Sequence, residues 1–142
     1  MLPLYGGGKT RFQPVYVGDV AAAAVNALAD AAAAGNTYEL GGPAVYSFAE
    51  LMEIVLKHTG RKRLLVPVPF VVGQIQAFFL GLLPRPLVTR DQILSLKTDN
   101  VVGDGALTLA DLGVQPTALE AIVPTYLGRY RRGGRFGRVS AA

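Results

Sequence analysis

The sequence has no cysteine and only one histidine, which narrows the chemistry that the chain can support. Without cysteine there is no disulfide framework, thiolate metal site or thiolate nucleophile. A metal site would depend on carboxylates almost alone, and no acidic cluster has the right spacing, so we expect no metal. His58 follows Lys57 near the end of a predicted helix, where a surface or capping role is expected over general-base catalysis.

Basic and acidic residues are nearly balanced along the sequence, and an excess of one sign is found only at its end. The formal net charge is +4, yet residues 1–128 hold nine basic and ten acidic side chains. Five arginines from Arg129 to Arg138 supply the excess. We therefore divide the chain into an α/β lobe, residues 1–128, and a basic Arg/Gly-rich tail, residues 129–142.

No secretion signal is visible after Met1, and the preference for Arg over Lys among abundant Ala suggests a GC-rich bacterial source. The composition, 51% hydrophobic and 17% charged over 142 residues, excludes a disordered or fibrous chain. One ordinary domain with a sizeable core is expected.

The segment Arg11–Ala24 predicts a strand that turns directly into a helix. Its first half is β-branched and aromatic, Gly18 permits a sharp turn, and Asp19 is expected to cap the helix. The run of alanines keeps that helix narrow enough to lie on a sheet, and Gly35 should end it after about Ala34.

A second short strand is predicted at Thr37–Leu40, which completes a βαβ unit with parallel strands and a right-handed crossover. Ligands of such units bind at the carboxyl ends of the strands. Here those ends are residues 17–19 and 40–42.

The sequence Tyr5–Lys9, YGGGK, matches the Y-x-x-x-K spacing of short-chain dehydrogenases, but we reject it as a catalytic pair. The pair needs a helix, and each of the three glycines would cost roughly 1 kcal/mol there. A turn is expected instead. The run also precedes a strand, whereas a dinucleotide-binding glycine loop follows one.

Capping boxes mark most of the remaining helix starts. Ser47–Glu50 predicts a helix to Thr59 that ends at Gly60. Thr89–Gln92 predicts a short helix to about Lys97, and Thr108 and Thr117 repeat the pattern. The helix opened by Thr117 should carry an apolar stripe, with Pro124 bending its middle.

The stretch Leu64–Leu83 has the length of a membrane span, but its prolines and glutamines argue against one. We expect a strand up to Pro67 and a separate apolar helix from about Pro69. Core burial of this helix is the favoured interpretation, and a docking face for a membrane or partner subunit is the alternative. Asp91, Asp99 and Asp104 are interpreted as solvated surface because their spacing fits no catalytic pair or calcium loop.

Three segments carry a resemblance to a known family: FQPVYVGDVAAA, TYELGGP and ALTLADLGVQPTALEAIVPTYLGRYR. Over nearly the whole chain the sequence resembles the C-terminal half of the NAD(P)H-binding accessory subunits of respiratory complex I. These are atypical relatives of the extended short-chain dehydrogenases, whose V-x-V-x-D-V-A element is matched from Val15 to Ala21.

The resemblance implies the C-terminal part of a Rossmann-like extended short-chain dehydrogenase fold, with the βαβ unit followed by a mainly helical lobe. The N-terminal Rossmann half is expected to be missing, so the chain alone should hold no cofactor and catalyse nothing. The parent would bind NADPH or NADH and serve assembly or stability of NADH:ubiquinone oxidoreductase. The residues expected near its cofactor or substrate are Arg11, Gln13, Tyr16 and Asp19.

The implied partners are other complex I subunits, the missing Rossmann half and anionic lipid, without nucleic acid. The expected contact residues are Phe70, Phe78, Phe79, Arg129, Arg131, Arg132 and Arg135. Such a protein would be peripheral, without a transmembrane span, on the cytoplasmic side of a bacterial inner membrane or on the mitochondrial matrix side. An exposed sheet edge also predicts self-association of the isolated chain. Two alternatives remain open: the substrate lobe of a sugar-nucleotide epimerase or reductase, and RNA binding through the tail.

Overall fold

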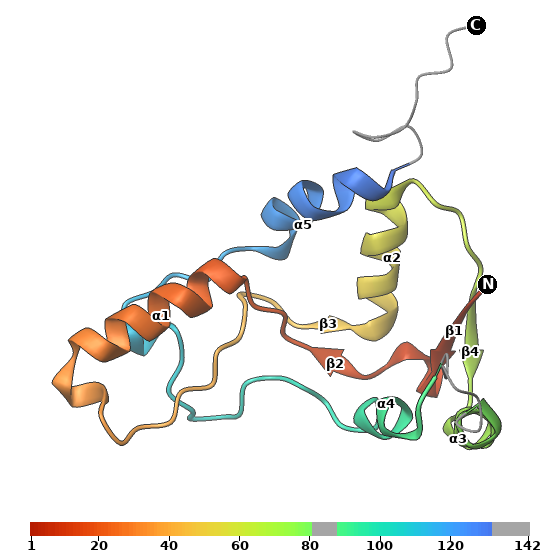
Figure 1. Ribbon diagram of the computed structural model, residues 1–142, viewed down its shortest axis with the longest axis horizontal. Helices are drawn as coiled ribbons and strands as arrows, with labels where there is room; N and C mark the ends of the chain where they lie inside the picture. The colour runs from red at the N-terminus through yellow and green to blue at the C-terminus, as the bar shows by residue number, and fades with distance from the viewer. Residues whose placement is uncertain (81–87, 132–142) are drawn as a thin grey trace, which may run out of the picture. The chain divides into compact units, whose positions relative to one another are not determined.

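The computed structural model describes residues 1–80 and 88–131, and shows a mixed α/β chain made of two compact units (Figure 1). Unit 1 consists of Met1–Phe12 and Tyr46–Asn100, and unit 2 of Gln13–Val45 and Val101–Ala142. Each unit is therefore assembled from two separate stretches of sequence. The following paragraphs take them one at a time.

A small parallel sheet organises unit 1. Strand β1, Leu2–Tyr5, pairs with β4, Leu65–Val68, and Leu2 lies opposite Leu65 in the register. The strand β4 confirms the extended segment predicted before Pro69, whereas β1 was not predicted. The glycines that follow β1 form a 3-10 turn, η1, Gly6–Gly8, in which all three have positive φ. Tyr5 and Lys9 therefore do not share a helix, as expected.

A two-residue antiparallel pair, β2 at Arg11–Phe12 with β3 at Tyr46–Ser47, leads into helix α2, Phe48–Thr59. The predicted capping box is confirmed: the Ser47 hydroxyl accepts from the Glu50 N–H at 3.2 Å, and the Glu50 carboxylate accepts from the Ser47 N–H at 2.7 Å. Gly60 ends the helix in the left-handed conformation.

Helices α3, Phe70–Leu80, and α4, Arg90–Ser95, complete unit 1 (Figure 1). The capping box at Thr89 is confirmed by reciprocal bonds with Gln92. The core contains Tyr5, Ala77 and Ile93. Core burial of the whole apolar helix is wrong, because only Gly73 and Ala77 of α3 are buried. Within residues 1–80 and 88–131, no helix is both long and apolar enough to cross a membrane.

In unit 2 the strand predicted up to Val17 does not form, and helix α1 runs from Val17 to Ala29. Pro14 has no N–H to donate to a sheet ladder, and the strand β2 stops two residues earlier. The N-cap of α1 is Tyr16, which makes no side-chain capping bond. The helix also ends earlier than predicted, at Asp30, whose carboxylate accepts from the Ala32 N–H and starts the 3-10 turn η2, Ala31–Ala33.

The predicted βαβ unit is therefore wrong. The segment expected as its second strand makes one parallel bridge, between Tyr38 and Leu107. The core of unit 2 forms instead where α1 meets the turn η3, Ala110–Leu112, and the buried residues there are Ala23, Ala33, Leu109, Leu112 and Val114. Large side chains on α1 would hold η3 further away. The alanines therefore permit close packing, as predicted, but the helix packs against a loop and not a sheet.

The last helix, α5, spans Leu119–Leu127 around Pro124 and continues as η4, Gly128–Tyr130. Its predicted start at a Thr117 capping box is wrong, because the N-cap is Ala118 and has no side-chain bond. None of its residues is buried.

Candidate functional site

The carboxylate of Asp19 is buried and binds Thr117. Thr117 donates its backbone N–H to one carboxylate oxygen at 2.6 Å and its hydroxyl to the other at 2.9 Å. The assignment of Asp19 as the cap of α1 is thus wrong, since the helix already begins at Val17. Asp19 instead fixes the segment that leads into α5. The position of Asp19 among valines and alanines was the one sequence signal that its carboxylate would be buried and hydrogen-bonded within the chain.

Gln13 joins three stretches of unit 2. Its amide nitrogen donates to the Gly42 carbonyl at 2.8 Å, and its amide oxygen accepts from the Val102 N–H at 3.0 Å. Glu39 adds a second tie by accepting from the Gly103 N–H at 2.7 Å. Both ends of the Gln13 amide are therefore used inside the chain.

Glycine is needed at positions 42 and 18 because the chain packs so closely there that neither site has room for a side chain. A Cβ on Gly42 would collide with the Pro14 carbonyl, and one on Gly18 with the Tyr16 ring. Residues 17–19 and 40–42, predicted as strand ends, flank the same Gln13–Tyr16 segment even though neither is a strand. Sequence alone could not show this juxtaposition.

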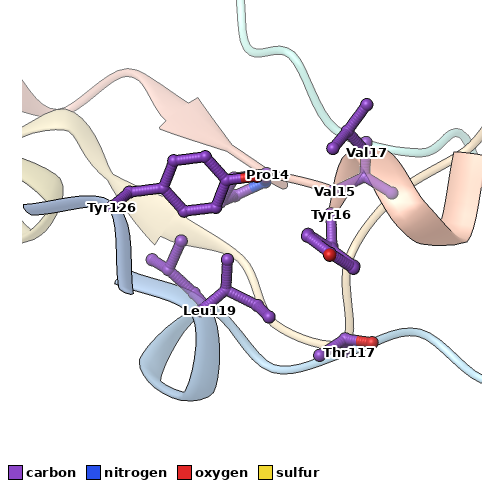
Figure 2. A pocket seen from close by; sticks show the side chains of 8 residues that line it. Pro14, Val15, Tyr16, Val17, Thr117, Leu119 and Tyr126 are labelled. Carbon is purple, nitrogen blue, oxygen red and sulfur yellow. The ribbon is translucent and has the colours of Figure 1, made fainter. Parts of the chain in front are cut away.

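A pocket of about 280 Å³ opens between the segment before α1 and helix α5. Figure 2 shows Tyr126 and Leu119 on one side of the pocket and Tyr16 and Val17 on the other, with Thr117 below Tyr16. The lining is completed by Pro14, Val15 and Ile122. The walls are apolar, and two phenols and one hydroxyl are the polar groups offered to a ligand.

The four residues predicted near a cofactor thus have different surroundings. Tyr16 lines the pocket, Gln13 and Asp19 brace its walls through the bonds described above, and Arg11 belongs to unit 1. Arg11 donates to Asp99 from its backbone N–H and from Nε, both at 2.8 Å. These two hydrogen bonds, backbone first, lower the pKa of Asp99. Asp99 is accordingly an exposed ion-pair partner and not merely solvated.

A second pocket, of about 470 Å³, lies within unit 1 between β1, α2 and α4. Phe12 and Phe48, whose ring centroids are 6.1 Å apart, form one wall, and Ile93 and Leu96 form another. Asp91 stands at this pocket. Within the described ranges no three His, Cys, Asp or Glu side chains come together as a metal site would require.

The predicted contact residues are only partly described. Phe78 and Phe79 are exposed on α3, whereas Phe70 is half-buried beneath the Lys97 ammonium, 5.8 Å from its ring centroid. Arg129 and Arg131 are exposed after α5. Arg132, Arg135 and the rest of the tail lie outside the described residues, as does the end of the apolar stretch at residues 81–83.

Comparisons with known proteins place the chain. No protein-family model matches it. It is 43% identical, over 94% of its length, to the Arabidopsis thaliana protein "NADH dehydrogenase (ubiquinone) 1 alpha subcomplex subunit 9, mitochondrial", and 36% identical over 88% to the Mus musculus protein of that name. It is 32% identical over 88% to the "NADH-ubiquinone oxidoreductase 40 kDa subunit, mitochondrial" of Neurospora crassa.

The chain spans about a third of the length of these relatives, 36%, 33% and 34% respectively. The relatives are eukaryotic, so the bacterial source remains a prediction. The agreement extends across both units, because it covers nearly all of the chain. The resemblance found in the motifs is confirmed, and the chain belongs to the family of the alpha subcomplex subunit 9 of complex I.

Proposed function

We propose that the chain is part of an accessory subunit of NADH:ubiquinone oxidoreductase and serves the assembly or stability of that enzyme without catalysing a reaction. The observation that carries the proposal is the 43% identity, over 94% of the chain, to a subunit named for this complex. The epimerase or reductase alternative is not favoured by these relatives, and RNA binding by the tail has no further support.

The internal bonds of unit 2 support a structural role. Gln13 and Asp19, the polar residues of the most distinctive segment, have both ends of their side chains committed to main-chain or hydroxyl partners. These bonds fix both side chains in position within the unit, which suits a structural role. Gln13 and Asp19 therefore stabilise the fold of unit 2 and the shape of its surface.

The proposal includes a bound cofactor in the whole subunit, but not in this chain alone. NADPH or NADH would be held by a Rossmann half of an extended short-chain dehydrogenase fold, of which the sheet β1–β4 would be an outlying part. Tyr16 would stand at the mouth of that site, with Gln13 and Asp19 behind it. Its ring can stack on a planar ligand, and its phenol can donate or accept a hydrogen bond.

The partners and location follow from the family. Other complex I subunits would cover part of the surface, and the protein would be peripheral to the membrane that carries the complex. The relatives are named as mitochondrial, which favours the matrix side, with the cytoplasmic side of an inner membrane as the bacterial equivalent. Self-association of the isolated chain remains a separate prediction.

A chimera tests the proposal. The matched third of the Neurospora crassa 40 kDa subunit is replaced by this chain in a strain that lacks the native subunit, and assembled complex I is measured on native gels. We expect assembly to be restored by the chimera and reduced by its Asp19→Ala variant. The matched control, Asp104→Ala, removes an exposed carboxylate and should restore assembly like the parent chimera.

Two results would overturn the proposal. One is a folded chimera, present at normal level, that leaves complex I unassembled. The other is turnover of a sugar nucleotide by the purified chain with added NAD(P)H, which would reinstate the enzyme alternative.

A further inference from the structure

Helix α3 presents an apolar face that no described residue covers. Its packing side is made of Gly73 and Ala77, and Gly73 fits so closely that an added Cβ would lie 2.6 Å from the Tyr5 ring. At about 100° per residue, five large apolar side chains fall within a sector of about 120° on the opposite side. This α3 face consists of Val71, Val72, Ile75, Phe78 and Phe79, all of them exposed.

The α3 face is continuous and uncharged. Helix α3 contains no charged residue, and its glutamines lie outside the sector. The rings of Phe78 and Phe79 stand edge to face with centroids 5.5 Å apart, yet remain 65% and 64% exposed. Exposed apolar surface of this kind marks a contact site.

The length of α3 limits the ways in which it can contact a membrane. Its 11 residues span roughly 16 Å at 1.5 Å per residue, about half the hydrocarbon thickness of a bilayer. Over the described residues the helix is too short to cross a bilayer, but it has the length to lie along its surface.

The net charge of the sequence is divided unequally between the units. Unit 1 has nine basic and four acidic side chains, whereas unit 2 is near neutral, with five basic and six acidic ones. The described basic residues of unit 1 are all exposed: Lys9, Arg11, Lys57, Arg61, Lys62, Arg63, Arg90 and Lys97. Lys97 lies directly over the first ring of α3, and Arg90 opens α4, which packs on α3. The apolar face thus belongs to the cationic unit.

We propose that unit 1 binds the surface of a bilayer that contains anionic lipid, with the α3 face inserted at the boundary between headgroups and acyl chains. The net positive charge of unit 1 would then strengthen its attraction to lipid phosphates. Net positive charge together with an unbroken apolar sector suits lipid better than a protein partner, since the sector offers no polar group to fix a partner's orientation. The inference goes beyond the proposed function, because it rests on unit 1 alone.

The test measures binding of the 142-residue chain to vesicles. Phosphatidylcholine vesicles are compared with vesicles containing roughly one third phosphatidylglycerol, and we expect binding to be about tenfold tighter to the latter and to weaken as salt is raised. Phe78→Asp and Phe79→Asp should each weaken binding by about tenfold or more. The matched control is Leu28→Asp on α1, where the side chain is 90% exposed but belongs to unit 2, and its binding should be unchanged.

Circular dichroism establishes that each variant is folded. Equal binding to neutral and anionic vesicles, or equal losses in the α1 and α3 variants, would overturn the proposal. Sedimentation that shows the α3 variants breaking a dimer, with vesicle binding intact, would assign the face to a second copy of the chain. Loss of complex I assembly with vesicle binding intact would assign it to a protein partner. Because assembly and vesicle binding are read separately, failure of this inference leaves the proposed function standing.

Discussion

Thr117 holds Asp19 through two hydrogen bonds that span 98 positions of sequence. The carboxylate is buried, so Asp19→Ala would leave the N–H and the hydroxyl of Thr117 without their acceptor and should cost roughly 2 kcal/mol in the free energy of unfolding. Thr117→Val should also destabilise the chain, which a simple helix cap at Asp19 would not predict. Urea unfolding measures both, and Asp104→Ala, an exposed carboxylate, should change stability by less than about 0.5 kcal/mol. Equal stability of the Asp19 and Asp104 variants would contradict this account.

The amide of Gln13 should tolerate no change of chemistry. Gln13→Glu keeps the acceptor for the Val102 N–H but places a carboxylate oxygen against the Gly42 carbonyl, and we expect a loss of about 1–3 kcal/mol by urea unfolding. Gln115→Glu, at an exposed position, is the control for adding charge to unit 2. A stable Gln13→Glu protein would show that the amide does not hold the three stretches together.

Gly73→Ala should destabilise unit 1 although alanine favours helices. The added Cβ would stand 2.6 Å from the Tyr5 ring and 3.3 Å from Ile93, and such overpacking costs about 1–3 kcal/mol. Gly128→Ala, where an added Cβ meets nothing within 4 Å, should be neutral or slightly stabilising. Thermal melts of the two variants in parallel would decide it, and equal melting temperatures would argue against close packing at Gly73.

Acid should remove stability supplied by three surface carboxylates. Hydrogen bonds lower the pKa of Glu50, Asp99 and Asp111, in each case first through a backbone N–H, from Ser47, Arg11 and Thr108 respectively. A carboxyl whose folded pKa is depressed stabilises the fold above its ordinary pKa, 4.5 for Glu50 and 3.8 for Asp99, and loses that contribution as the pH falls through the folded value. NMR titration should show all three below their ordinary pKa.

One variant isolates the cause at Asp99. Arg11→Ala removes the guanidinium donor but keeps the backbone N–H, so the pKa of Asp99 should rise only part of the way to its ordinary value. A complete return would show that the side chain alone lowers it.

Local signals predicted the parts of the fold that depend on neighbours in sequence. Ser47 and Thr89 cap the helices they were expected to cap, and the strand ahead of Pro69 gives way to α3 as the prolines indicated. Thr117 carries the same capping pattern and does not cap. Its hydroxyl and N–H are taken by Asp19, a partner that no local window contains.

The candidate site was less predictable for the same reason. Tyr16 was identified from its segment, but the opposite wall comes from Leu119 and Tyr126 on α5. The strand expected at Val15 and Val17 had the right residue types, but the proline at position 14 denies it a donor and the helix begins first. Strand propensity depends on residue type alone, so it could not predict which segments these side chains would pack against.

The order in which the two units are interleaved has a consequence for biosynthesis. A ribosome releases Met1–Phe12 long before Tyr46–Asn100, and most of the first half of unit 2 emerges between them. Neither unit can be completed until the later of its two stretches has emerged, and Asp19 must wait for Thr117 to leave the exit tunnel. The stretch of each unit that emerges first therefore waits, exposed to chaperones and proteases, for the second stretch. A chain that stops after Asn100 would leave the Asp19 carboxylate without Thr117.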